Sequence, residues 1–235
     1  MPEIKVNGVN INYELRGRGE PLVLIGGLSI DIVELEPVIS ELAGRFQVLA
    51  FDNRGSGLSG KPDEPYSIGM MAEDTAALME AAGIGRASVI GISMGGRIAL
   101  TLALSHPDKI SRLVLVSTSC RGIRGWRYPV LDFISRLPGL RGRNPQPAYA
   151  RRRQHQAVLD FDCCASLGDI QAPTLILHGR KDRIAPYPLA QEMHAAINGS
   201  QLVTFAGGHL FLFLSPKGWQ KFFDTVDEFL SQRPS

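Results

Sequence analysis

The stretch Ser88–Leu100, which reads SVIGISMGGRIAL, carries the strongest signal in the chain. An apolar, partly β-branched run ends at Ser93 between two glycines, and a pattern typical of a helix begins directly after it. A sharp turn from strand to helix exposes and orients a serine hydroxyl, and it requires small neighbours because its backbone is strained and tightly packed. The stretch therefore predicts Ser93 as a nucleophile at such a turn.

The composition is that of an ordinary globular protein. Of the 235 residues, 44% are hydrophobic and 20% are charged, and the net charge is +2. This length fits one large α/β domain, alone or with a small insertion. We expect neither a secretory signal nor a membrane span, because no basic start precedes an apolar run and no apolar run reaches about 18 residues. A cytoplasmic location is the resulting prediction.

The three cysteines predict reduced thiols. Cys120, Cys163 and Cys164 are odd in number and lack the spacing of metal ligands, and adjacent cysteines seldom bridge each other. We therefore expect no metal site, and because no helix start of the phosphate-binding kind is present either, we expect no cofactor.

Strands and helices alternate along most of the chain. Asn7-Gly8 lies between two alternating segments and predicts a hairpin at the start. Alternation of this kind predicts a mostly parallel sheet with helices on both faces. We expect further strands at 22–25, 46–51, 88–92, 112–117, 173–178 and 201–205, and helices at 33–43, 70–82, 94–105, 188–197 and 217–231.

Residues 119–168 interrupt the alternation and are expected to form a short arginine-rich cap, or lid. Residues 1–118 and 169–235 would then form the core. Between Arg121 and Arg153 the sequence has nine arginines and a single acid, Asp132, so this stretch carries +8 and the remainder −6.

Three interpretations of these arginines stay open. They form a solvated face, they bind a substrate carboxylate through residues such as Arg121, Arg124 and Arg127, or they meet an anionic surface such as a membrane. Nucleic acid is the least favoured partner, because no recognised nucleic-acid-binding fold accompanies the arginines. A small-molecule substrate is the expected partner, and the oligomeric state is left open.

An acid and a histidine follow Ser93 in the sequence, each placed shortly after an expected strand. Asp182 comes four residues after an expected strand, and His209 comes shortly after the next one. Both lie where the carboxyl ends of parallel strands form ligand crevices. The order serine, acid, histidine is the one found on sheets of this type.

With these residues the chain resembles the α/β-hydrolase superfamily over nearly its whole length, in particular the serine esterases, enol-lactonases and C–C hydrolases. The matching segments are 52–59 (DNRGSGLS), 91–95 (GISMG), Gly179 with Asp182, and Gly208-His209. The resemblance implies an eight-stranded, mostly parallel sheet flanked by helices, with a small cap. It also implies Ser93 as nucleophile, His209 as general base and Asp182 as the acid that orients it.

The resemblance further implies an oxyanion hole. Its expected donors are the backbone N–H groups of Met94 and Leu28, with Gly27 beside the substrate. Many relatives carry a histidine where this chain has Gly26, but backbone groups do the binding, so we expect the hole to persist.

Several other features favour structural roles. Residues 55–60 match G-x-G-x-x-G, but the proline-rich segment that follows cannot open a helix, so a turn is favoured over a dinucleotide site. Asp52 and Arg54 are interpreted as a pair that stabilises this turn. His178 is expected beneath the loop of Asp182.

The remaining histidines are not expected to be catalytic. His106 is placed at the end of a helix, and His155 and His194 are placed at the surface.

The function predicted from the sequence is hydrolysis of carboxylic esters by a serine nucleophile through an acyl-enzyme, without a cofactor. The alternative is a C–C bond hydrolase or enol-lactonase that acts on small acidic substrates. A minor alternative is a non-catalytic receptor or scaffold on the same fold.

Overall fold

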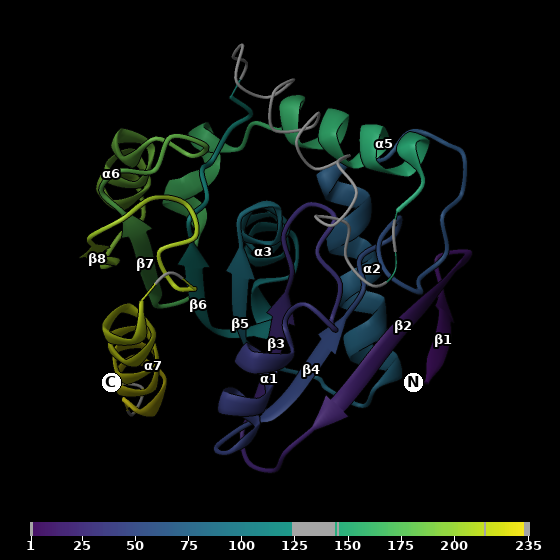
Figure 1. Ribbon diagram of the computed structural model, residues 1–235, viewed down its shortest axis with the longest axis horizontal. Helices are drawn as coiled ribbons and strands as arrows, with labels where there is room; N and C mark the ends of the chain where they lie inside the picture. Colours follow the sequence, from purple (N-terminus) through teal and green to yellow (C-terminus); the bar gives the residue numbers. More distant parts are fainter. Residues whose placement is uncertain (1, 124–143, 145, 214, 233–235) are drawn as a thin grey trace.

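The computed structural model describes residues 2–123, 144, 146–213 and 215–232, and it shows an eight-stranded sheet in the order β1-β2-β4-β3-β5-β6-β7-β8 (Figure 1). β1 and β2 form an antiparallel hairpin, β2 is antiparallel to β4, and all other pairs are parallel. The predicted α/β fold and its eight-stranded sheet are confirmed. The strands are β1 Glu3–Val6, β2 Val9–Arg16, β3 Pro21–Ile25, β4 Gln47–Phe51, β5 Ala87–Ile92, β6 Ile110–Val116, β7 Thr174–Gly179 and β8 Gln201–Phe205.

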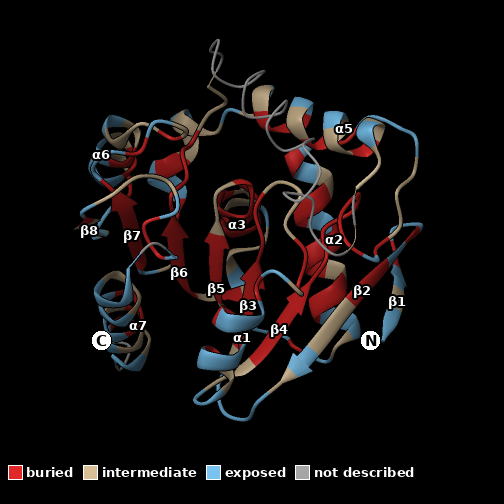
Figure 2. Cartoon of the chain, viewed as in Figure 1, coloured by how far each residue is buried: buried red, intermediate tan, exposed pale blue. Residues whose placement is uncertain are grey.

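Helices cover both faces of the sheet, because the central strands are apolar on both sides (Figure 2). One face packs against α2 (Ile68–Ala81), α3 (Met94–Ser105) and α6 (Tyr187–Ala196), and the other packs against α1 (Glu36–Ala43) and α7 (Pro216–Ser231). The short helices η1 (Pro107–Lys109) and η2 (Cys164–Asp169) lie in connections. Within the described residues, no helix combines the length and the hydropathy needed to cross a bilayer.

The expected hairpin forms at Asn7-Gly8. Both residues have positive φ, 46° and 80°, as a two-residue turn between antiparallel strands requires. The first sheet segment is therefore determined by local turn chemistry.

One helix lies where no regular structure was expected. α5 (Ala148–Leu159) crosses the carboxyl ends of the parallel strands and lies within the segment 119–168 that was predicted to form a cap (Figure 1). The hydrophobic periodicity typical of a helix is weak here, because the buried positions of α5 do not carry large apolar side chains. They are Ala150, Gln154, Ala157 and Val158.

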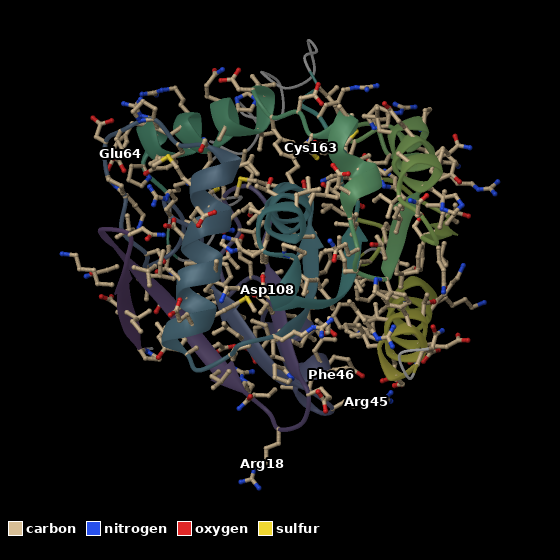
Figure 3. All side chains as sticks on the ribbon, turned by 180° about the vertical axis from the view of Figure 1, so that it is seen from behind. Arg18, Arg45, Phe46, Glu64, Asp108 and Cys163 are labelled. Carbon is tan, nitrogen blue, oxygen red and sulfur yellow. A yellow bond between two sulfur atoms is a disulfide. The ribbon has the colours of Figure 1, made fainter. Side chains whose placement is uncertain are left out.

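The prediction of reduced thiols is wrong for two of the three cysteines. Cys120 and Cys164 form a disulfide with their Cα atoms 5.0 Å apart, although 44 residues separate them. Only Cys163 and Cys164 are neighbours in the sequence, whereas the fold brings the chain after β6 against the start of η2 and so places Cys120 beside Cys164. Cys163 stays a free thiol near α5 (Figure 3), and burial raises its pKa to about 12.

The segment after β4 is a turn, as expected, but Asp52 and Arg54 do not pair with each other. Asp52 accepts hydrogen bonds from the N–H groups of Ile32 and Leu58. Arg54 forms a bidentate pair with Asp74 on α2, at 2.6 and 2.8 Å. The two side chains therefore anchor the turn to different elements.

α3 begins in close contact with β3. A Cβ atom placed on Gly95 would lie 2.1 Å from the carbonyl oxygen of Ile25, which is far inside van der Waals contact. Only glycine allows the first turn of α3 to approach the strand this closely.

We predict that Gly95→Ala lowers the free energy of unfolding by more than about 2 kcal/mol, because the backbone of β3 has to move. Gly85→Ala is the matched control, since its Cβ would meet nothing within 4 Å. Urea denaturation of both variants measures the difference. Equal stability of the two variants would contradict the close approach.

Candidate active site

Ser93 lies at the turn between β5 and α3 in a strained conformation. Its φ is 56° and its ψ is −113°, a region that costs a non-glycine residue on the order of 1–3 kcal/mol. Neighbouring groups hold it there: its N–H donates to the carbonyl of Val116 at 2.9 Å, and the hydroxyl of Thr118 donates to its carbonyl at 2.7 Å. The strained turn therefore carries the half-buried Ser93 side chain at the carboxyl end of β5.

Asp182 lies in the loop that follows β7. Its Oδ1 accepts hydrogen bonds from the N–H groups of Ile184 at 2.8 Å and Ala185 at 2.9 Å. These two bonds fix the carboxylate and leave Oδ2 for another partner. The loop packs against the next one, since a Cβ on Gly179 would lie 2.4 Å from the carbonyl oxygen of Gly208.

His209 joins the other two side chains. Its Nδ1 is 2.8 Å from Oδ2 of Asp182, and its Nε2 is 2.9 Å from Oγ of Ser93. Its backbone is held too, because the hydroxyl of Ser117 donates to its carbonyl at 2.9 Å. The structure thus brings these three side chains together, although Ser93 and His209 lie 116 positions apart in the sequence.

A second histidine supports the acid. His178 is fully buried in β7, as expected beneath the loop, with Nε2 2.7 Å from the carbonyl of Ala185 and 3.3 Å from Oδ2 of Asp182. An Nε2–H tautomer donates toward both oxygens. His178 therefore helps to hold the carboxylate in place.

The environment keeps Asp182 ionised. Burial acts to raise the pKa of Asp182, but hydrogen bonds from His178 and His209, the charge of His209 and the N–H of Ala185 together outweigh it. The pKa of this carboxyl consequently lies well below its usual range. The ionised carboxylate of Asp182 lies beside Nδ1 of His209, which favours the tautomer with its proton on Nδ1 and leaves Nε2 able to accept a proton.

The loop after β3 lies against Ser93. A Cβ on Gly27 would be 3.4 Å from the Cβ of Ser93, and Asn53 donates to the carbonyl of Gly26 at 3.1 Å. Leu28 follows in this loop and is half-buried, while Met94 begins α3 and is buried. The backbone N–H groups of Leu28 and Met94 remain the predicted donors of an oxyanion hole.

Two described arginines of the predicted cap pair with acids. Arg121 donates to Glu192 on α6 at 2.6 Å, and Arg153 donates to Asp63 at 2.9 Å. Arg124 and Arg127 lie outside the described residues. Arg121, a candidate for binding a substrate carboxylate, therefore already has a carboxylate partner within the protein.

The other histidines are not part of this arrangement. His106 ends α3, as expected, and its Nε2 lies 3.0 Å from a carboxylate oxygen of Glu73. His194 is exposed, as expected, whereas His155 on α5 is half-buried.

The described part of the chain offers a poor set of ligands for a metal ion. The group of potential ligands there consists of Cys120, Cys164 and Glu192. Two of these are joined in a disulfide, and the third pairs with Arg121.

Two amide side chains of the cap segment, Gln146 and Gln154, were not expected near the site. Gln154 and Gln146 contact Ser29, the residue after Leu28, and no motif marks them. A polar residue at a core position of a helix is the signal that could have found Gln154, but it requires the helix to be recognised first.

The chain is similar to known proteins of one family. A family model described as alpha/beta hydrolase fold matches residues 20–161. YisY of Bacillus subtilis, an AB hydrolase superfamily protein, is 30% identical over 86% of this chain and 89% of its own.

Two solved structures are also similar. A hydrolase from Pseudomonas aeruginosa has a TM-score of 0.87 at 25% identity, with 98% of each chain covered. The enol-lactonase from Burkholderia xenovorans has a TM-score of 0.84 at 25% identity and covers 98% of this chain and 100% of that one. With the fold, the family model and these relatives in agreement, this chain is a member of the alpha/beta hydrolase fold family.

Proposed function

We propose that the protein hydrolyses carboxylic esters through an acyl-enzyme on Ser93. The observation that carries the proposal is the position of His209, whose two ring nitrogens lie 2.9 Å from Oγ of Ser93 and 2.8 Å from Asp182. A hydroxyl, a base and an orienting carboxylate in this geometry are what nucleophilic acyl transfer requires.

The proposed reaction has two halves. Oγ of Ser93 attacks the ester carbonyl while His209 removes the hydroxyl proton. The resulting oxyanion accepts hydrogen bonds from the backbone N–H groups of Leu28 and Met94. The intermediate collapses, and the alcohol leaves with the proton held by His209. Water then attacks the acyl-enzyme with His209 again as base, which releases the acid and restores Ser93.

The same groups suit related acyl compounds. An enol-lactone is a cyclic ester, and the similarity to a Burkholderia enol-lactonase supports this class as the second candidate. Acidic substrates are less favoured, because Arg121 and Arg153 already pair with Glu192 and Asp63. A non-catalytic role is disfavoured, because Ser93, Asp182 and His209 are all present and hydrogen-bonded.

We predict that Ser93→Ala lowers the turnover of p-nitrophenyl butyrate by about four orders of magnitude or more and abolishes labelling by a fluorophosphonate. Ser105→Ala at the exposed end of α3 serves as control and retains both. Labelling of Ser93→Ala at another serine, with turnover preserved, would refute the assignment.

We predict that kcat/KM for ester hydrolysis rises once as the pH increases. Because histidine side chains lose their proton between about pH 5 and 8, kcat/KM increases across this interval. Asp182 adds no inflection near pH 4, since its pKa is lowered and it stays ionised as the pH falls through the usual carboxyl range. Stopped-assay measurements from pH 4 to 9 check this, and a flat profile would argue against a histidine base.

Arg121 and Arg153 are expected to discriminate only weakly between an acidic substrate and its neutral analogue. Both are partly exposed and already paired with acids, so they attract a substrate carboxylate only slightly, and salt screens the attraction. A hemisuccinate ester and its neutral analogue should therefore have kcat/KM values within about threefold at 0.5 M NaCl. A preference of tenfold or more that survives this salt would favour the acidic-substrate alternative.

A further inference from the structure

The side chain of Gln154 is a buried polar junction between the cap and the core. It points from α5 into the protein and has no exposed surface. Its Oε1 accepts from the N–H of Ser29 at 3.1 Å and from Gln146 at 2.9 Å, and its Nε2 donates to the carbonyl of Arg54 at 2.8 Å and to Oγ of Ser56 at 2.9 Å. All four hydrogen-bonding positions of the amide are thus in use.

One half of the amide holds the loop that carries a predicted oxyanion donor. Ser29 directly follows Leu28 and has a φ of 63°, which a serine keeps only where surrounding contacts hold it. Gln154 accepts from its N–H, and Gln146 accepts from its hydroxyl at 2.6 Å. Two amides of the cap therefore hold the residue next to Leu28.

The same loop is tied to the cap and to the core at other points. Asn144 of the cap donates to Asp31 at 3.1 Å, and Asn53, in the turn after β4, donates to the carbonyl of Gly26 at 3.1 Å. The other half of the Gln154 amide binds that turn through Arg54 and Ser56. Gln154 consequently joins three segments that are distant in sequence: α5, the loop after β3 and the turn after β4.

We propose that Gln154 is a positioning residue, which sets the backbone of Ser29 so that the adjacent N–H of Leu28 points to the oxyanion. This inference rests on the proposed function, because the oxyanion forms only in acyl transfer. An oxyanion donor acts on the transition state, and a displacement of about 1 Å can cost roughly a hundredfold in rate. The cap is then part of the catalytic apparatus and not only a cover.

The test compares Gln154→Met with Gln156→Met. Methionine keeps the length of the side chain but removes all four hydrogen bonds, and Gln156 lies exposed on the same helix. We expect Gln154→Met to lower kcat for p-nitrophenyl butyrate about tenfold to a hundredfold while KM stays within twofold. Affinity for a trifluoromethyl ketone, which mimics the tetrahedral adduct, falls by a similar factor, and the pH profile keeps its midpoint. Gln156→Met leaves all of these unchanged.

Amide hydrogen exchange tests the inference without any substrate. In Gln154→Met the N–H of Ser29 loses its acceptor, so a peptide covering residues 26–31 exchanges faster than in the native protein and in Gln156→Met. Faster exchange in a protein that hydrolyses no ester would disprove the proposed function and not the contact.

Gln146→Met provides the second variant in case Gln154→Met does not fold. Gln146 is half-buried and precedes α5, and its replacement removes the acceptor of the Ser29 hydroxyl. A fall in kcat of about threefold to tenfold at constant KM is expected. Folded variants whose kcat and inhibitor affinity stay within twofold of the native values would overturn the proposal.

Discussion

The strained turn at Ser93 is the constraint on which the rest of the site depends. A positive φ at this residue is maintained by the carbonyl of Val116, the hydroxyl of Thr118 and the close approach of Gly95 to β3. These contacts come from buried residues at the carboxyl end of β3 and at or just after the end of β6, so the close-packed core stabilises the strain. Because Ser93 is fixed in this way, the loops after β7 and β8 need only bring Asp182 and His209 to it.

The cap contributes contacts of a different kind. The core is held by apolar packing, whereas α5 faces the core with small residues and the amide of Gln154. A hydrogen-bonded junction is directional, so it fixes the geometry of a loop better than apolar contact does. The disulfide between Cys120 and Cys164 holds the two ends of the same segment together, one just after β6 and the other at the start of η2.

The fold could be predicted from the sequence because its signals are local: strand periodicity and the glycines around Ser93 can be read from short stretches. Ser93, Asp182 and His209 could be chosen as candidates because each closely follows an expected strand, and the structure brings the three side chains together. The Cys120–Cys164 disulfide, the Arg54–Asp74 pair and the contacts of Gln154 could not be predicted in this way, because each depends on which distant segments the fold brings together. α5 escaped notice because its buried face holds alanines and a glutamine.

Rapid acid quenching followed by peptide mass mapping shows whether Ser93 forms an acyl-enzyme. During turnover of p-nitrophenyl butyrate, we expect a butyryl group, about 70 Da, on the peptide that contains Ser93. The adduct should disappear when the ester is exhausted. Ester hydrolysis with the butyryl group on another residue, or with no adduct during turnover, would show that Ser93 is not the nucleophile.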